Sequence, residues 1–244
     1  MRRLLVFSLH VLMFIGAVPC SLLSQEVSPE AQLPREVFFA ESSLYSVLYS
    51  GRVPEEYYAH AGTFYIDSRQ FVPCALMYNN KYYGIVHLNI NAHKDQLLVL
   101  LPNNRMRVVL NPLLVNYFIL NDEKFIYHSG DTLSGLAKGY YAVLHDGDVK
   151  ILRHVKKEPK EVEDPARSVV YMEFFPAVTF HAIKNGVVYH VSGKRRFIKI
   201  FSDHKKELKA LIRKEHLDFK LFPERAYSVC ASFYESLIQQ GEDI

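Results

Sequence analysis

The clearest change of hydrophobic pattern lies near the C-terminal end of the chain. From Val187 to Phe201 apolar and polar residues broadly alternate, which is typical of a strand, and from Asp203 the spacing of apolar residues becomes helical. Asn185-Gly186 lies just before this stretch, and the pair favours a two-residue type I′ turn because both residues tolerate positive φ. We therefore predict a β-hairpin that continues into helices.

Two amphipathic helices are predicted after this hairpin. The first runs from Asp203 to Lys214 and has a basic face, and the second begins at about Pro223, because proline suits a first helical turn. The apolar positions of the second helix recur at helical spacing; they are Ala226, Val229, Cys230, Phe233, Tyr234, Leu237 and Ile238. One face of this helix must therefore be buried.

Upstream, from Ser42, short aromatic and β-branched runs alternate with turn residues such as Asn79-Asn80 and Asp146-Gly147. Strands do not alternate with helices, so nothing indicates a parallel sheet. The expected strands include LYSVLYSGR (44–52), GTFYID (62–67), FVPCALMY (71–78) and KYYGIVHLNI (81–90). The pattern predicts an α+β protein that is mainly β, with an antiparallel β-meander sheet or half-barrel and two short C-terminal helices.

One long charged run interrupts the strands. Lys156 to Asp164 (KKEPKEVED) has no apolar face, so we expect a solvated loop that divides the chain. The predicted organisation is a signal peptide at 1–24, a loose lead-in at 25–41, an antiparallel β domain at 42–155, and a hairpin-plus-helices unit at 165–240. Whether the last two parts share one core stays open.

The N-terminal residues predict export. Two arginines precede an apolar run that ends at Val18, and small and polar residues follow, which is the layout of a secretory signal peptide cleaved near Ser24. Cys20 raises lipidation as an alternative, although Pro19 before it fits the processing motif poorly. We expect a protein of the periplasm, the cell envelope or the extracellular space.

Charge and cysteine content narrow the function classes. Removal of residues 1–24 lowers the formal charge from +3 to +1, and a nearly neutral chain argues against a nucleic-acid partner. Cys74 and Cys230 remain. In an oxidising compartment they could form a disulfide, and the alternative is that Cys230, on the apolar face of its helix, is a buried free thiol.

Aromatic residues supply the candidate binding residues. The chain has 16 Tyr and 16 Phe but no Trp, and the pairs Tyr82-Tyr83 and Tyr140-Tyr141 place consecutive rings on opposite faces of a strand. Exposed tyrosines on a sheet can bind sugars or peptides through broad apolar contact. The alternative interpretation is cross-strand aromatic packing within the sheet.

No motif specifies a reaction, a metal or a cofactor. The sequence contains no G-x-S-x-G elbow, no zinc-type histidine or cysteine spacing and no phosphate-binding loop, so we assign no catalytic residue, no metal ligand and no cofactor. His87, His93 and Asp95 are close in sequence, and a metal site formed by them is one interpretation. The simpler interpretation places His87 in a strand and the other two residues in the turn that follows it.

Several segments resemble a large group of uncharacterised exported proteins from bacteroidete bacteria. They are LYSGR (48–52), GTFYID (62–67), NNKYYG (79–84), GYYAVLHDGDVKIL (139–152) and KNGVVYHVSGKRRFIKIFSDHKKELKALIRKEHLDF (184–219). The group carries a tyrosine-rich "GYYxLLYDGxVKLL" hairpin and a closing "KKELKKYIKxNKLDF" helix. In this chain Asn89 and His93 stand where the group has an arginine and a tyrosine. The resemblance implies an exported, β-rich protein and no particular activity.

These observations favour an exported non-enzymatic protein that binds a small molecule, a glycan or a protein, or that contacts the cell envelope. One alternative is a secreted or periplasmic hydrolase whose site is assembled from separate strands. Another is a membrane-peripheral structural protein held on anionic lipid by the basic helix, with Lys194, Arg195 and Arg196 adding to its charge. Exposed lysines on a solvated helix are the simpler explanation of that basic face.

Overall fold

A computed structural model describes residues 46–55, 60–102, 106–130, 135–164 and 169–242. Residues from Leu44 onward belong to one compact unit, and only that unit is described below. The expected signal peptide at 1–24, with Cys20, and the expected lead-in at 25–41 lie outside the described residues.

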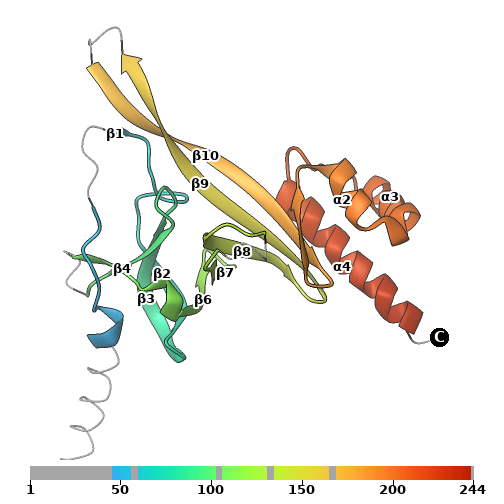
Figure 1. Ribbon diagram of the computed structural model, residues 1–244, viewed down its shortest axis with the longest axis horizontal. Coiled ribbons are helices and arrows are strands. Elements are labelled where there is room, and N and C mark those ends of the chain that lie inside the picture. The colour runs from blue at the N-terminus through green and yellow to red at the C-terminus, as the bar shows by residue number, and fades with distance from the viewer. Residues whose placement is uncertain (1–45, 56–59, 103–105, 131–134, 165–168, 243–244) are drawn as a thin grey trace, which may run out of the picture. The chain divides into compact units, whose positions relative to one another are not determined.

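One open sheet of eleven strands forms the body of this unit (Figure 1). Its strands are β1 (His60–Ala61), β2 (Val72–Tyr78), β3 (Lys81–Asn91), β4 (Gln96–Leu100), β5 (Arg107–Val109), β6 (Val115–Leu120), β7 (Glu123–His128), β8 (Gly139–Asp146), β9 (Val149–Asp164), β10 (Val169–Lys184) and β11 (Val187–Val191). Their order is β1-β10-β9-β8-β7-β6-β2-β3-β4-β5, and β11 also pairs with β10.

Among the described strands, every pairing is antiparallel except that of β1 with β10. The helices follow the last strand: α2 (Lys194–Ile200), α3 (Lys205–Lys214) and α4 (Pro223–Glu242), with short 3₁₀ turns at Pro112–Leu114 and Ser202–His204. The prediction of a mainly β, antiparallel α+β fold with C-terminal helices is confirmed. The sheet does not close into a barrel.

The C-terminal hairpin has the predicted turn. Lys184 of β10 pairs with Val187 of β11, and Asn185 and Gly186 have φ values of 52° and 73°. Asn79-Asn80 likewise joins β2 and β3 with positive φ at both residues, whereas β8 and β9 are joined by Gly147-Asp148, one residue later than expected. Asparagine and glycine tolerate this left-handed conformation, so the turns at Asn79-Asn80 and Asn185-Gly186 were readable from the sequence.

The strand predicted to run from Val187 to Phe201 is wrong beyond Val191. Gly193, with φ of 142°, ends the extended segment, and α2 follows immediately, so the C-terminal part contains three helices. Phe197 and Phe201 are fully buried one helical turn apart. The segment is too short for its periodicity to distinguish a strand from a helix. Packing of Phe197 and Phe201 into the core beside the other helices favours the helix.

The two later helices occupy the predicted segments. α4 begins at Pro223 and buries Ala226, Cys230 and Tyr234 of the predicted apolar face. Val229 and Phe233 are half-buried against the same core. α4 is anchored to the sheet, since the Ser228 hydroxyl donates to the Leu144 carbonyl at 2.9 Å.

The charged run 156–164 is not a loop, so that prediction was wrong. These residues form the outer half of β9 and pair continuously with β10 as far as Asp164↔Val169. The pairing of β9 with β8 reaches only His154, and on that side Lys157 contacts the β3–β4 turn; among the described residues no strand pairs with β9 on that side beyond Lys157. Pro159, which has no amide hydrogen, is tolerated on that open edge, and exposed charges there disfavour edge-to-edge association.

Two expected strands near the N-terminus are also wrong. Of the expected strand 44–52 the structure describes residues 46–52; there 46–48 form a helical turn and only Arg52 makes an isolated bridge, to Val109. In 62–67, only Tyr65 does so, to Asn91. Leu48 and Tyr65 are nevertheless buried. Their apolar character therefore reflects packing onto the sheet, which β-propensity does not distinguish from membership of a ladder.

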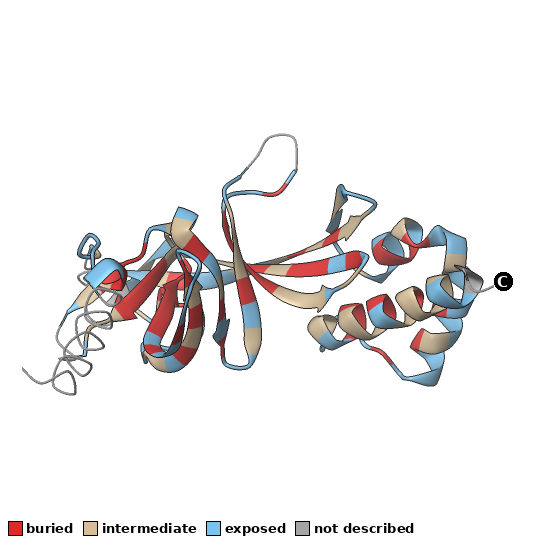
Figure 2. Cartoon of the chain, turned by 90° about the horizontal axis from the view of Figure 1, so that it is seen from below, coloured by how far each residue is buried: buried red, intermediate tan, exposed pale blue. Residues whose placement is uncertain are grey.

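Two large hydrophobic cores hold the unit together. The first lies within the sheet and includes Leu76, Leu88, Val99, Phe118 and Phe125, and the second lies between the last strands and the helices and includes Ile151, Phe197, Phe201, Leu208 and Tyr227. Figure 2 shows buried positions both on the strands and on the helix faces turned toward them. The helices thus cover one end of the sheet.

Candidate anion-binding groove

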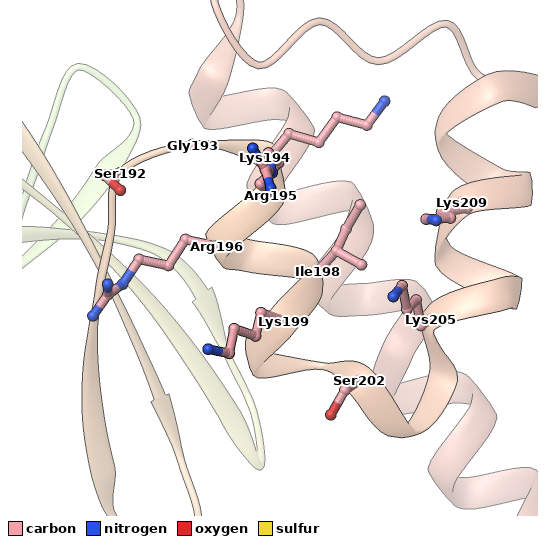
Figure 3. A pocket seen from close by; sticks show the side chains of 10 residues that line it. All are labelled: Ser192, Gly193, Lys194, Arg195, Arg196, Ile198, Lys199, Ser202, Lys205 and Lys209. Carbon is pink, nitrogen blue, oxygen red and sulfur yellow. The ribbon is translucent and has the colours of Figure 1, made fainter.

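An open groove of about 870 Å³ lies along α2 and α3 (Figure 3). We call it the basic groove. Its lining contains six cationic side chains and no carboxylate; the cations are Lys194, Arg195, Arg196, Lys199, Lys205 and Lys209. Lys205 and Lys209 point from α3 toward α2, where the Ile198 side chain lies between the two helices. Cations from two elements therefore share one concave surface.

The amphipathic sequence of each helix produces this arrangement. In α2, Phe197 and Ile198 are buried, which leaves Lys194, Arg195 and Lys199 exposed. In α3, Leu208 and Ile212 are buried and the basic positions are exposed. Because each apolar face is held in the core, the charged faces are presented to solvent.

The positive charge of the groove is not neutralised within the described residues. None of its six cations forms an ion pair there, and Arg196 donates from Nε to the His190 carbonyl at 2.8 Å. The nearby Asp203 carboxylate already binds the Lys184 ammonium at 3.1 Å and accepts from the Tyr234 hydroxyl at 2.5 Å. This acid is therefore engaged by partners other than the cations of the groove.

This local charge contrasts with the rest of the chain. Residues 194–214 contain nine Lys or Arg and two Asp or Glu, whereas the remaining residues have four more acids than bases. Clustered charge of one sign attracts ligands of the opposite sign to a concave surface. The positive potential is thus concentrated on the helices.

The predicted binding tyrosines do not form one exposed platform. Tyr82 is 61% exposed and Tyr83 is buried, as expected for neighbours on opposite faces of β3. Tyr140 and Tyr141 are both buried, because both faces of β8 are covered where they lie. Tyr83 and Tyr140 pack in the sheet core, and the Tyr141 hydroxyl donates to the Ala137 carbonyl at 2.8 Å.

The two cysteines are free thiols, so the possible disulfide between Cys74 and Cys230 is not formed. Cys74 lies in the sheet core and Cys230 in the core beneath the helices. Burial raises the pKa of Cys74 to about 11 and that of Cys230 to about 12. Both therefore stay protonated at neutral pH and are poor nucleophiles.

His87, His93 and Asp95 lie where the simpler interpretation placed them. His87 is an exposed residue of β3, and the other two belong to the turn between β3 and β4. The Asp95 carboxylate contacts His154 Nε2 at 2.8 Å and Lys156 Nζ at 2.5 Å. Among the described residues no group of three or more His, Cys, Asp or Glu side chains could hold a metal ion.

These contacts attach the β3–β4 turn to β9. His93 Nδ1 lies 3.0 Å from the Lys157 carbonyl, and the Lys157 amide donates to the Ala92 carbonyl at 3.0 Å. Four strands separate β3 from β9 in the sheet order, so the sheet curls to bring them together. The buried Asp95–His154 pair was missed from the sequence, because its members are 59 residues apart and no local pattern links them.

The described residues thus combine an open antiparallel sheet with helices at one end that carry a cationic groove. Comparison with protein-family models, with curated proteins and with solved structures finds no match to this chain. Within the described residues, no helix has the length and the apolar character that a membrane crossing requires.

Proposed function

We propose that this chain is an exported, non-enzymatic protein that binds an anionic ligand in the basic groove. The observation that carries the proposal is the set of six cations that line the groove without a carboxylate partner among the described residues. Guanidinium groups bind phosphate or carboxylate oxygens in a fork, and ammonium groups bind them as point charges. The shared chemistry of the ligand is therefore a cluster of oxyanions.

The lining supports binding more than catalysis. Apart from the cations, it consists of Ser192, Gly193, Ile198 and Ser202, so it offers no imidazole or carboxylate as a general base next to a serine. Ile198 adds an apolar contact between the two helices. This lining favours a binding protein over the alternative of a secreted or periplasmic hydrolase.

An anionic membrane surface is one source of such oxyanions, and a soluble polyanion is the other. Each Lys or Arg near an anionic bilayer contributes about 1 kcal/mol of attraction, which salt screens over about 8 Å at physiological ionic strength. The expected export would place the chain beside the lipids of the cell envelope. A groove with six cations would then bind reversibly and with strong dependence on salt.

The test measures binding of the full chain to vesicles and to a soluble anion. The vesicles contain phosphatidylglycerol in phosphatidylcholine or phosphatidylcholine alone, and the soluble probe is tripolyphosphate. We expect Lys205→Glu with Lys209→Glu to weaken binding at least tenfold, because the change places two negative charges in the groove. The matched control is Lys206→Glu with Lys214→Glu, which makes the same charge change on exposed positions of α3 outside the groove lining.

The outcomes separate the two sources. Binding to anionic vesicles but not to tripolyphosphate identifies the membrane surface, and binding to both identifies a discrete oxyanion site. An equal loss in the groove variant and the control would show that general charge, and not the groove, attracts the anion. Absence of binding to either probe at low salt would overturn the proposal.

A further inference from the structure

Two large apolar residues that are adjacent in sequence are exposed where α4 begins. Leu221 is 72% exposed and Phe222 is 63% exposed. Single exposed apolar residues are common on soluble proteins and need no explanation, whereas two large neighbours that both face solvent are unusual. We call Leu221 and Phe222 the apolar pair. Burial in the core does not account for it.

The turn that carries the apolar pair has a defined backbone. The Asp218 carboxylate accepts from the amides of Lys220 and Leu221 at 2.7 and 3.0 Å, and the Phe222 amide donates to the Asp218 carbonyl at 3.1 Å. Phe219 anchors the turn, since its ring centroid lies 5.2 Å from that of Tyr227 in α4. The exposure of the apolar pair is therefore set by a hydrogen-bonded turn.

Helix capping does not explain the apolar pair either. Phe222 directly precedes the first residue of α4 and its carbonyl accepts from the Ala226 amide at 3.1 Å, so it occupies the N-cap. This position favours Ser, Thr, Asn or Asp, whose side chains accept from a free amide of the first turn, which phenylalanine cannot do. Leu221, one residue earlier, could pack against Ala226, but it is exposed instead. The fold thus gains little from either side chain.

The turn belongs to the same helices as the basic groove. The Phe219 ring also packs against Phe197 of α2, with a centroid distance of 6.1 Å. The residues on either side of Phe197, Arg196 and Ile198, line the basic groove. A helical region that offers both cations and exposed apolar side chains fits the boundary between lipid headgroups and acyl chains.

The charges beside the apolar pair favour an anionic partner. Lys220 and Arg225 flank the pair and are exposed. Of the two acids closest in sequence, Asp218 accepts from the amides of the turn and Glu224 contacts Arg153 at 3.4 Å. An anionic bilayer attracts such cations toward its surface, and it also offers an apolar interior to the side chains between them.

We propose that the apolar pair enters the acyl boundary of an anionic bilayer while the cations of the basic groove bind the lipid headgroups. This inference rests on the proposed function and deepens it, because it selects the membrane surface as the source of the oxyanions. The contribution of apolar burial grows with the buried area, whereas salt screens the contribution of the charges. Binding to anionic vesicles should therefore keep a salt-resistant part that depends on the apolar pair.

A fluorescent reporter can be placed in the apolar pair, because the chain contains no Trp. Phe222→Trp in the full chain introduces a single tryptophan. On vesicles of phosphatidylglycerol in phosphatidylcholine, its emission should shift to shorter wavelength, and lipids brominated in their acyl chains should quench it. The control is Leu113→Trp, at a 74% exposed position in the 3₁₀ turn after β5, whose emission should not change.

A pair of serine substitutions tests the binding itself. Leu221→Ser with Phe222→Ser should weaken binding to the anionic vesicles at least tenfold and remove the salt-resistant part. Serine suits an N-cap, so the melting temperature should not fall. The matched control is Val53→Ser with Leu113→Ser, at positions 62% and 74% exposed, and it should bind like the native chain. Neither variant changes the lining of the basic groove, so tripolyphosphate binding should be equal in all three proteins.

The results distinguish failure of this inference from failure of the proposed function. The inference is overturned if the tryptophan emission is neither shifted nor quenched on vesicles that the chain binds, or if the serine variant binds them as tightly as the native chain. Equal binding to phosphatidylcholine alone, or binding to tripolyphosphate without binding to anionic vesicles, would also overturn it. The proposed function survives binding to tripolyphosphate alone. Absence of binding to either probe overturns both.

Discussion

The sheet and the helices at its end use charged residues in opposite ways. In the sheet, Asp95 contacts His154 and Lys156, and Arg153 binds Glu123 at 2.5 Å and Glu224 at 3.4 Å. These groups join segments that are distant in sequence. On α2 and α3, the cations of the basic groove have no carboxylate partner among the described residues. Charge in the sheet thus joins distant segments, whereas the cations along α2 and α3 have no such role within the described residues.

The two regions also have separate hydrophobic cores, although β9 contributes to both. Its first residues, Val149 and Ile151, are buried under the helices, and Val155 packs against the sheet core. The outer half of the strand is largely exposed. One long hairpin therefore connects a region stabilised by paired strands to a region stabilised by helix packing. Four predictions test this division, and they run from the largest expected effect to the smallest.

Truncation of a large core side chain tests whether the cores are separate. Phe118→Ala in the sheet core and Phe201→Ala under the helices should each lower the free energy of unfolding by about 3 to 5 kcal/mol, because each residue is fully buried. Hydrogen exchange should rise mainly in β2–β7 for the first variant and in α2–α4 for the second. Equal increases over both regions would show one cooperative core. Leu113→Ala, at a 74% exposed position, is the control.

Loss of the Asp95 charge tests the attachment of the β3–β4 turn. Asparagine tolerates the φ of 50° at this position, so Asp95→Asn removes the charge and keeps the backbone. We expect the free energy of unfolding to fall by about 3 kcal/mol in urea denaturation, because a buried, hydrogen-bonded charge pair is broken. Asp67→Asn, at an exposed residue, should change it little. A fall below about 0.5 kcal/mol would contradict the assigned role.

His181 should make stability depend on pH. Burial, followed by the nearby His190 and His154, lowers the pKa of His181 from 6.5 to about 4. The unfolded chain takes up this proton below pH 6.5 and the folded chain only near pH 4, so the stability present above pH 6.5 is lost as pH falls through this window. With allowance for partial exposure, we expect a loss of about 2 kcal/mol.

The measurement compares urea denaturation of the native chain and of His181→Phe between pH 7 and pH 4. The aromatic ring preserves packing against Tyr141, whose ring centroid lies 5.9 Å from that of His181. The difference between the two curves isolates the His181 proton from those of other groups. If the free energy of unfolding of His181→Phe falls with pH as steeply as that of the native chain, another group causes the pH dependence. The control is His87→Phe at an exposed position, which should behave like the native chain.

The smallest expected effect is on the stability of the basic groove variants. Lys205→Glu with Lys209→Glu should change the free energy of unfolding by less than about 0.5 kcal/mol, since both residues are exposed and unpaired in the described structure. A larger loss would mean that these cations stabilise the helices. If the variant loses anion binding but keeps its stability, the groove cations do not stabilise the fold, in contrast to the Asp95 charge.

Local patterns in the sequence determined most of the fold. The Asn185-Gly186 turn, the start of α4 at Pro223 and most strands from β2 to β8 were predicted, because turn chemistry and side-chain periodicity act within a few residues. The basic residues of the C-terminal segment were also identified in advance. What the sequence did not reveal is that 194–200 is a helix, so that two sets of cations line one groove.

Long-range contacts decided the rest. The charged run 156–164 is a strand only because β10 lies opposite it, and the pairing of strands outweighs a local preference for a loop. The Asp95–His154 contact depends on the curl of the sheet, which brings the β3–β4 turn against β9. The sequence alone therefore determined most of the elements and the positions of the charges, whereas only the tertiary structure decided which charges are paired within the described residues.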